Sequence, residues 1–504
     1  MINKLDYILD RITMYRVVLY SLLLLLFYAI ILSIFVLSFT PIQIIISFGI
    51  IFVSSLVSNY VFAKIFSVPS NIESVYITAL ILTLICIPFR SPSDIPLLIF
   101  AGIFAMASKY IFTVNNTHIF NPAGFGMVFS SLMLGNSAGW WIGSWYFAPL
   151  VVVLGMCIVR KLRYTRMVLS FFLVSILVTL LLLLMKSANV ALSLQNSMMN
   201  SFVLFLGFFM LTDPLTLPSK RNMQIVYGGL VGLLSVPQFQ IASLYFAPEL
   251  ALCIGNVFAY IVNPKYTIIL RLKEKMKIAP DIYDFIFDKN KKISFVPGQY
   301  MEWTLAHSRI DSRGMRRYFT LASSPTENDI RIGVKYYQNA SSYKQQLFNL
   351  KEGETIVASQ LSGDFVLPKN SDKKLVFIAG GIGITPFRSM VKYLVDRNEK
   401  RDIVLLYLNK RENEIVYKDI FEAGADNGVR SIYLLTGVDY KCIKNTLYQG
   451  RVTKEKIELL IPDFRERIFY ISGPHLMVTE CEKILRELSV KKEKIKVDYF
   501  PGLV

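Results

Sequence analysis

The stretch LVFIAGGIGITPFRSM, residues Leu375–Met390, carries the clearest local pattern in the chain. Its first four residues, Leu375–Ile378, predict a short buried strand. The glycines that follow predict a turn, and Pro386 stands where a helix can begin, because a first turn needs no N–H from that residue. Amides and a helix dipole then favour an anion, and glycine lets a pyrophosphate come close. A tight turn without a ligand fits a glycine run equally well, so the flanking sequence has to decide.

Composition divides the chain into an apolar half and a charged half. Of the 504 residues, 54% are hydrophobic, and the mean hydropathy of +0.47 is too high for an entirely soluble protein. Long apolar runs fill residues 14–263, whereas residues 264–504 have the composition of an ordinary globular protein. We predict an all-α polytopic membrane domain in residues 1–263 and two further domains in residues 264–370 and 371–504.

The distribution of positive charge predicts a membrane topology. Eleven of the thirteen Lys and Arg residues up to Val262 fall on one side of a ten-segment arrangement, and only Arg90 and Lys186 fall on the other. The net charge of +18 therefore indicates a lipid bilayer and not a nucleic acid. We predict a multi-pass cell-membrane protein with residues 264–504 in the cytoplasm. The segment cores lie near residues 17–37, 43–62, 74–88, 96–112, 122–135, 143–159, 167–185, 201–212, 224–235 and 241–262.

Cysteine and histidine usage limits the metal chemistry. The five cysteines are scattered, with no spacing typical of a disulfide framework, a zinc site or a plant-type iron–sulfur cluster. Two stacked haems with paired histidine ligands need four membrane histidines, whereas the chain has three histidines and only His118 lies in the apolar half. We therefore predict no metal site.

Two of the apolar segments are short and interrupted by proline. One begins after His118 and Asn121, and the other ends at Thr212 and Asp213. Such segments are typical of broken helices that line a central site. Two ordinary helix ends with polar caps explain the same pattern equally well. If the breaks form a site, its cofactor-binding candidates are His118, Asn121, Thr212 and Asp213.

The segments HIFNPAGFGMV and FFMLTDPLTLPSKRNMQIVYGGLVGLL resemble the two signature regions of one family of membrane proteins, the NqrB/RnfD family. Its members are membrane components of the sodium-translocating NADH:quinone oxidoreductase and of the Rnf complex. The resemblance covers about residues 15–262 and implies about ten helices in two similar halves, with flavin in the electron path. The family's Ser-Gly-Ala-Thr motif for covalent FMN is absent here, so a second flavin in this domain would be non-covalent FMN.

Residues 265–504 resemble the ferredoxin–NADP reductase superfamily. Four signatures occur in the family's order: RYFTLASSP, IAGGIGITPF, YISGPHLM and an aromatic–glycine element near the C-terminus. The resemblance implies an FAD-binding antiparallel β-barrel in residues 264–370, whose opening segments already predict strands. It implies an α/β NAD(P)-binding domain in residues 371–504.

The family's motifs assign roles to residues of the predicted barrel. Arg317 matches the arginine that pairs with the FAD pyrophosphate, a task that suits a guanidinium. Phe319 matches the aromatic residue beside the flavin, and Thr320 matches the hydroxyl near its N5 atom, where hydride arrives. Lys335 and Ser342, further along the chain, are weaker candidates for binding the FAD phosphates. The predicted FAD ligands are Arg317, Tyr318, Phe319, Thr320, Lys335 and Ser342.

The same resemblance places the dinucleotide in the second domain. Ser472 stands where many relatives have cysteine, so with Thr320 it is a predicted catalytic residue, with slower or altered transfer. Lys410 and Arg411 follow a predicted strand and fit either a 2′-phosphate of NADPH or a solvated strand exit, so NADH and NADPH both remain open. The aromatic–glycine element consists of Phe500 and Gly502. The predicted cofactor contacts are Gly380, Gly381, Gly383, Thr385, Gly473, Pro474 and Phe500.

Three functions compete at this point. The first is an FAD-dependent NAD(P)H oxidoreductase that passes electrons into the membrane domain, to a flavin or a quinone. The second is a redox-coupled ion transporter, for which Asp213 would be the intramembrane carboxylate. The third is a ferredoxin or flavodoxin reductase that the membrane domain merely anchors, with electron-transfer partner proteins as its acceptors.

Overall fold

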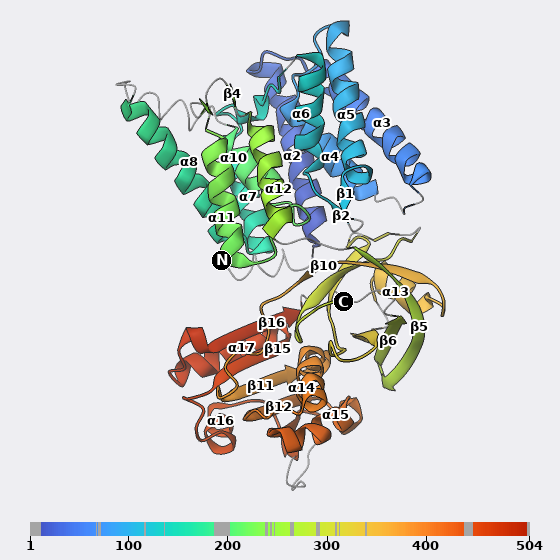
Figure 1. Ribbon diagram of the computed structural model, residues 1–504, viewed down its shortest axis with the longest axis vertical. Helices are drawn as coiled ribbons and strands as arrows, with labels where there is room; N and C mark the ends of the chain where they lie inside the picture. The colour runs from blue at the N-terminus through green and yellow to red at the C-terminus, as the bar shows by residue number, and fades with distance from the viewer. Residues whose placement is uncertain are drawn as a thin grey trace. The chain divides into compact units, whose positions relative to one another are not determined.

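The chain forms two compact units, Met1–Thr267 and Ile268–Val504. The computed structural model describes residues 12–500 except 67, 69–71, 115–116, 136, 186–201, 237–239, 242–243, 246, 263–266, 289–292, 308–309, 312, 338–339 and 438–446. Figure 1 shows helices throughout the first unit and two strand-rich parts in the second.

Helices lie at all ten predicted apolar segments of the first unit. Among the described residues, only four stretches are, by length and composition, long and apolar enough to cross a membrane: Met14–Phe35, Pro41–Ile65, Pro92–Tyr110 and Thr165–Met185. A ten-helix membrane domain therefore stays a prediction. The described helices are α2 (Met14–Phe35), α3 (Pro41–Ile65), α4 (Ile72–Ile85), α5 (Ile95–Tyr110), α6 (Pro122–Leu134), α7 (Ala148–Leu162), α8 (Thr165–Met185), α10 (Val203–Phe205) with the π-turn η3 (Leu206–Met210), α11 (Arg221–Leu234) and α12 (Pro248–Val262).

The two halves of the first unit pack their helices in the same order. In the first half α3 packs on α4 and α5, and a hairpin of β1 (Thr113–Val114) and β2 (Thr117–His118) leads into α6. In the second half α8 packs on η3 and α11, and a hairpin of β3 (Gln240–Ile241) and β4 (Leu244–Tyr245) leads into α12. The halves meet through α2 against α7 and α6 against α12. Corresponding helices therefore pair across the unit.

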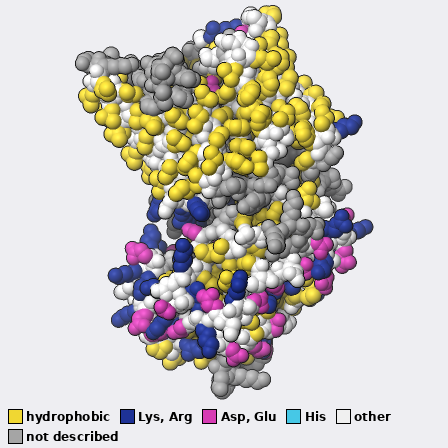
Figure 2. Space-filling model, viewed as in Figure 1, with side chains coloured by type: hydrophobic (Ala, Val, Ile, Leu, Met, Phe, Trp, Pro, Cys, Tyr) yellow, Lys and Arg dark blue, Asp and Glu magenta, His cyan; other side chains and the backbone are white. Residues whose placement is uncertain are grey.

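The long helices of this unit bury polar residues and expose apolar ones. On α8, Ser175 and Thr179 are buried, whereas Leu173 and Leu177 are 66% and 57% exposed. Helix α3 likewise buries Asn59, two serines and two isoleucines. Figure 2 shows hydrophobic side chains over much of the visible face of these helices. This arrangement is the reverse of a surface helix in water, where the apolar face is turned to the core.

The second unit begins with a six-stranded antiparallel sheet. Its strand order is β8-β7-β10-β5-β6-β9, and a hydrogen bond of 2.8 Å from the Ala322 N–H after β8 to the Arg331 carbonyl of β9 brings the two edge strands together. Alternating residues such as Met301 and Trp303 fill the interior. This is the predicted β-barrel. Its elements are β5 (Ile268–Ala279), β6 (Ile282–Asp288), β7 (Tyr300–Thr304), β8 (Arg316–Thr320), β9 (Asp329–Lys335), α13 (Ser342–Asn349) and β10 (Thr355–Ser362).

A parallel sheet follows in the order β14-β13-β12-β11-β15-β16. Phe377 of β11 packs with α14 and α15 on one face, and Ile378 packs with α16 and α17 on the other. Strand order reverses between β11 and β15, and ligands bind at such a switch point. The elements are β11 (Leu375–Gly380), η4 (Gly381–Ile384), α14 (Thr385–Arg397), β12 (Ile403–Asn409), η5 (Glu412–Glu414), α15 (Lys418–Ala423), β13 (Val429–Leu435), β14 (Leu447–Gln449), α16 (Lys454–Leu460), β15 (Ile468–Pro474), α17 (His475–Glu487) and β16 (Ile495–Phe500).

Candidate active site and the polar node of the helical unit

Arg317 of β8 is a buried guanidinium in which two of the three nitrogens lack acceptors among the described residues. The residue is 5% exposed, and its Nη1 donates to the carbonyls of Arg313 at 2.8 Å and Arg316 at 2.7 Å. Its Nε and Nη2 have no hydrogen-bond partner among the described residues. The guanidinium carbon lies 5.1 Å from the ring centre of Tyr343, in the first turn of α13. Burial lowers the pKa of Arg317, because its charge is not compensated. A diphosphate would supply the missing acceptors, so the residues present fit FAD.

The neighbours of Arg317 along β8 divide between two faces. The ring of Phe319 lies 6.1 Å from Tyr343, on the Arg317 side. Tyr318 is turned away, since its hydroxyl donates to the buried Glu302 at 2.8 Å and its ring packs against Tyr300. In the β8 motif, Arg317 and Phe319 therefore lie on the inner face. Tyr318 faces the other way and does not approach Arg317.

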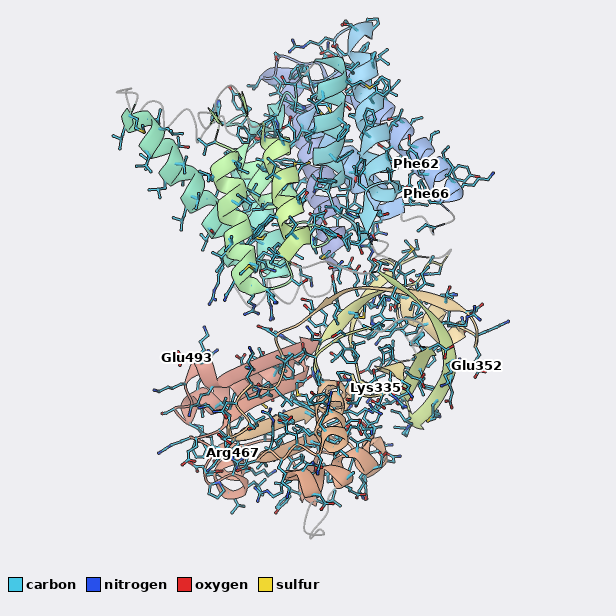
Figure 3. All side chains as sticks on the ribbon, viewed as in Figure 1. Phe62, Phe66, Lys335, Glu352, Arg467 and Glu493 are labelled. Carbon is cyan, nitrogen blue, oxygen red and sulfur yellow. The ribbon has the colours of Figure 1, made fainter. Side chains whose placement is uncertain are left out.

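Thr320, Lys335 and Ser342 lie in different surroundings. Thr320 is buried and paired with Tyr300 across the sheet. Lys335 forms an ion pair of 3.4 Å with Glu414, where the barrel meets the second domain (Figure 3). The Ser342 hydroxyl accepts from the Asp311 N–H at 3.0 Å and contacts His307 at 2.9 Å. Lys335 and Ser342 thus have protein partners, which weakens their assignment as phosphate ligands.

The three glycines of the β11–η4 loop have different surroundings. A Cβ on Gly380 would lie 2.3 Å from the Met477 sulfur, and one on Gly383 would lie 2.3 Å from the Ser472 carbonyl. Of the three, Gly381 alone faces open space, and its φ of +52° is one that glycine adopts most readily. Gly381 is therefore the glycine beside which a pyrophosphate has room. Gly380 and Gly383 let the loop close on β15.

The start of α14 and the end of β15 lie beside the glycine loop. The Thr385 hydroxyl donates to the Ile382 carbonyl at 3.1 Å, so it serves the turn itself. Ser472 is fully buried, and its hydroxyl has no partner among the described residues. Gly473 packs against Gly380, and Pro474 is exposed and pairs with Phe500 of β16. Gly502 lies outside the described residues. Ser472 and the glycine loop thus lie side by side at the switch point.

Two buried ion-pair groups join the barrel to the parallel-sheet domain of residues 371–504, and sequence reasoning missed both. Arg388 of α14, 4% exposed, donates to both carboxylate oxygens of Glu327 at 2.8 and 2.9 Å. The buried Asp284 of β6 accepts from the Tyr417 hydroxyl and from Arg331 at 2.7 Å. Burial raises the pKa of Asp284, and these two donors act against it. Nothing in the local sequence of α14 distinguishes Arg388 from the other charged residues of that helix.

In the helical unit, the two predicted breaks meet at a buried asparagine of α12. Asn256, which is fully buried, accepts from the Asn121 N–H at 2.8 Å and donates to the Thr216 carbonyl at 3.2 Å. Asn121 also caps α6 and reaches the Met210 carbonyl at 3.4 Å. We call Asn121, Thr216, Asn256 and Tyr227 the polar node. A lone asparagine within an apolar segment was the signal that could have revealed it.

The remaining candidates of this unit serve their own helix turns. The Thr212 hydroxyl donates to the Phe208 carbonyl at 2.8 Å, and Asp213 accepts from the Leu215 N–H at 3.1 Å. His118 lines a cavity of about 20 Å³ beside the polar node. That volume holds about one water. The residues present therefore do not fit an enclosed second flavin, because protein groups already satisfy the broken backbone.

Family models match both parts of the second unit. Residues 269–366 match an oxidoreductase FAD-binding domain, and residues 377–483 match an oxidoreductase NAD-binding domain. A flavohemoprotein from Bacillus anthracis is 28% identical over 245 residues, which cover 47% of this chain and 60% of the relative. Flavohemoprotein A from Dictyostelium discoideum is 25% identical over 244 residues, covering 45% and 59%. The chain thus spans less than two thirds of the length of these relatives.

Solved structures with a similar part include the FAD/NAD-binding domain of a nitric oxide dioxygenase from Vibrio cholerae. It is 20% identical, covers 46% of this chain and 98% of that chain, and has a TM-score of 0.40. A cytochrome P450 reductase from Amycolatopsis is 21% identical, covers 47% and 70%, and has a TM-score of 0.42.

The second unit is that of an FAD-dependent NAD(P)H oxidoreductase, because both cofactor domains are matched and occur in sequence. The two matched domains agree with the FAD-binding and NAD(P)-binding domains that the sequence predicted for residues 264–504. FAD and a nicotinamide dinucleotide are therefore its cofactors.

Proposed function

We propose that the chain is a membrane-bound NAD(P)H oxidoreductase. Its second unit takes electrons from NAD(P)H on the cytoplasmic side and delivers them, through FAD, to an acceptor at the membrane such as a quinone. One observation carries the proposal: a single chain joins an oxidoreductase unit to a helical unit that turns apolar side chains outward.

The packing of the helical unit supports a lipid environment. Leucines such as Leu173 and Leu177 on α8 would be costly to expose to water over so large a patch. Small and polar residues such as Ser175 lie at the helix contacts, as in membrane bundles. The positive-inside distribution points to the same side for both chain ends.

The residues of the second unit have separate tasks in this proposal. Arg317 binds the FAD diphosphate, and the N-terminus of α14 with Gly381 binds the dinucleotide. Thr320 and Ser472 are the proposed side chains at the hydride-transfer site. Arg388 holds the two domains together through Glu327. When bound, FAD accepts two electrons at once and can release them singly.

The finer description of the membrane part is also a proposal. We keep the domain limits 1–263, 264–370 and 371–504, and the kinship with the NqrB/RnfD family of membrane proteins. The repeated packing order and the polar node between the two signature regions support that kinship. FMN in this unit stays a weaker idea, because the space beside Asn256 is small. We route no electrons through such a group.

Two alternatives remain distinguishable by experiment. Asp213 caps a turn, which gives the ion-transporter function no specific support. An anchored ferredoxin or flavodoxin reductase would need a soluble protein acceptor. The test measures NAD(P)H oxidation by the full chain in detergent with ferricyanide, a short-chain quinone, or flavodoxin.

The proposal expects activity with ferricyanide and with the quinone. No activity with ferricyanide, in a preparation that contains FAD, would refute the reductase function itself. Activity with ferricyanide and flavodoxin but not with quinone would establish the anchored reductase instead. The Arg317→Ala variant is the control, because every FAD-dependent activity should fall with its FAD content.

A further inference from the structure

The two cofactors of the second unit belong to different domains. The FAD-binding match covers the barrel, and the NAD-binding match covers the parallel-sheet domain. Hydride passes only when the nicotinamide ring lies against the flavin, so the relative position of these two domains is itself part of the active site. Side chains that fix this position are therefore candidates for a role in the reaction.

Tyr417 joins the two domains at one point of the barrel. It directly precedes α15 in the parallel-sheet domain, and its hydroxyl donates to the fully buried carboxylate of Asp284 on β6. Gly333 of β9 lies directly across the sheet from Asp284. A Cβ on Gly333 would lie 2.8 Å from the Tyr417 hydroxyl oxygen, so the glycine leaves the room that the tyrosine needs to reach the carboxylate.

The same point of β9 touches the glycine loop of the parallel-sheet domain. A Cβ on Gly333 would lie 3.1 Å from the Ile382 Cδ1 atom of η4 and 2.9 Å from the Thr385 Cγ2 atom at the start of α14. Tyr417, η4 and α14 thus converge on one residue of the barrel. A shift of the barrel at Gly333 would therefore change its position relative to the loop that we assign to the dinucleotide.

Tyr417 also links the two buried ion pairs of this joint into one network. Its ring lies 5.2 Å from the guanidinium carbon of Arg388, the partner of Glu327. Its hydroxyl shares Asp284 with Arg331, which donates to the other carboxylate oxygen at 2.7 Å. The φ of Tyr417 is +57°, a left-handed conformation that a bulky residue adopts only at a cost. The contacts of its ring and hydroxyl offset that cost.

We propose that Tyr417 is a positioning residue for hydride transfer, because its hydroxyl holds the barrel where flavin and nicotinamide can meet. The inference rests on the reductase chemistry of the second unit and gives Tyr417 a task that it performs through Asp284. Without the hydroxyl, Asp284 keeps only Arg331 of these two donors, and the joint can relax at Gly333. A misplacement of about 1 Å between reacting groups can lower a rate about a hundredfold.

The experiment compares Tyr417→Phe with wild type, both as full chains in detergent that contain FAD. Stopped-flow bleaching of the flavin over a range of NAD(P)H concentrations gives the limiting rate and the dissociation constant separately. Tyr417→Phe should lower the limiting rate roughly tenfold. It should leave the FAD content and the dissociation constant of NAD(P)H near wild type, because each cofactor stays bound to its own domain. The long-wavelength absorbance of a nicotinamide stacked on the flavin should weaken.

Tyr433→Phe is the matched control, since it removes the hydroxyl of another buried tyrosine of the parallel-sheet domain. Tyr433 lies on β13, and its ring packs against Tyr407 of β12. This variant should keep the wild-type limiting rate and absorbance. In the chain without cofactors, the amides of η4 should exchange hydrogen faster in Tyr417→Phe than in wild type or in Tyr433→Phe.

A double-mutant cycle with Asp284→Ala tests whether the hydroxyl acts through the carboxylate. Once Asp284 is replaced, adding Tyr417→Phe should slow the reduction little further. A wild-type limiting rate in Tyr417→Phe would overturn the inference even if the variant unfolds at a lower temperature, because a purely structural role changes stability alone. An equal loss of rate with and without Asp284 would also overturn it. A wild-type chain whose FAD is not reduced by NAD(P)H would instead refute the reductase chemistry on which the inference rests.

Discussion

A pair of glycine variants tests how the β11–η4 loop is built. A Cβ at Gly383 would lie 2.3 Å from the Ser472 carbonyl oxygen and 2.7 Å from Gly473 Cα, about 1 Å short of ordinary contact. Both atoms are backbone, so η4 must move away from β15. Overpacking of this kind costs about 1–3 kcal/mol. We therefore expect Gly383→Ala to loosen the contact between the loop and β15 while the barrel keeps its FAD.

Gly381→Ala is the matched control, because the same methyl group meets open space there. Its cost is the left-handed backbone at φ +52°, about 1 kcal/mol. Stopped-flow bleaching of the flavin by NAD(P)H and thermal unfolding of the full chain measure both variants. Gly383→Ala should lower the unfolding temperature of the domain of residues 371–504 by roughly 5–10 °C and raise KM for NAD(P)H strongly.

Gly381→Ala should unfold within a few degrees of the wild-type unfolding temperature. Its main effect should be weaker binding of NAD(P)H. The reasoning fails if Gly383→Ala has the unfolding temperature and the NAD(P)H turnover of wild type, since a backbone clash of this size must change at least one of these two quantities. It also fails if Gly381→Ala is the less stable protein of the pair.

Three further predictions concern other parts of the chain. Arg317→Ala should lower FAD affinity at least tenfold, measured by flavin retention through gel filtration, because the diphosphate loses a charged partner. Glu327→Gln should destabilise the second unit at pH 7, because it leaves the buried Arg388 unpaired. Although burial acts to raise the pKa of Glu327, its bonds with Arg388 hold that pKa below the usual value. The difference between wild type and Glu327→Gln should therefore begin to shrink as pH falls below about 4.5, and it should vanish once pH lies below the lowered pKa. Asn256→Ala should lower the thermal stability of the helical unit in detergent by several degrees, whereas Asn256→Asp should lose the bond to the Thr216 carbonyl, because a carboxylate has no N–H to donate; equal stability of all three proteins would contradict the polar node.

The elements that the sequence predicted are those with a short-range physical cause. The strand–glycine–helix order at residues 375–390 follows from apolar run length, turn residues and a first-turn proline. The helices of the first unit follow from their apolar runs. Arg317 was found through a motif, and its two buried nitrogens without acceptors among the described residues agree with the role that the motif implies.

The remaining features depend on which segments meet in space. Nothing local distinguishes Gly381, which faces open space, from Gly383, which touches β15. The period of a strand predicts that Tyr318 and Phe319 face opposite sides, but it does not say which side belongs to the flavin. Asn256 is a single polar residue in an apolar run, Arg388 is one of several polar residues of α14, and their partners lie 135 and 61 residues away.

The five-helix halves of the first unit have a consequence for how such a chain arose. A bundle with an odd number of crossings begins and ends on opposite sides of a bilayer, so a single half would carry an appended reductase to the side away from its own N-terminus. Joining two halves restores both ends to one side. If each helix of both halves crosses, a reductase joined after the second half would face the side of the N-terminus, and the two halves would insert in opposite senses.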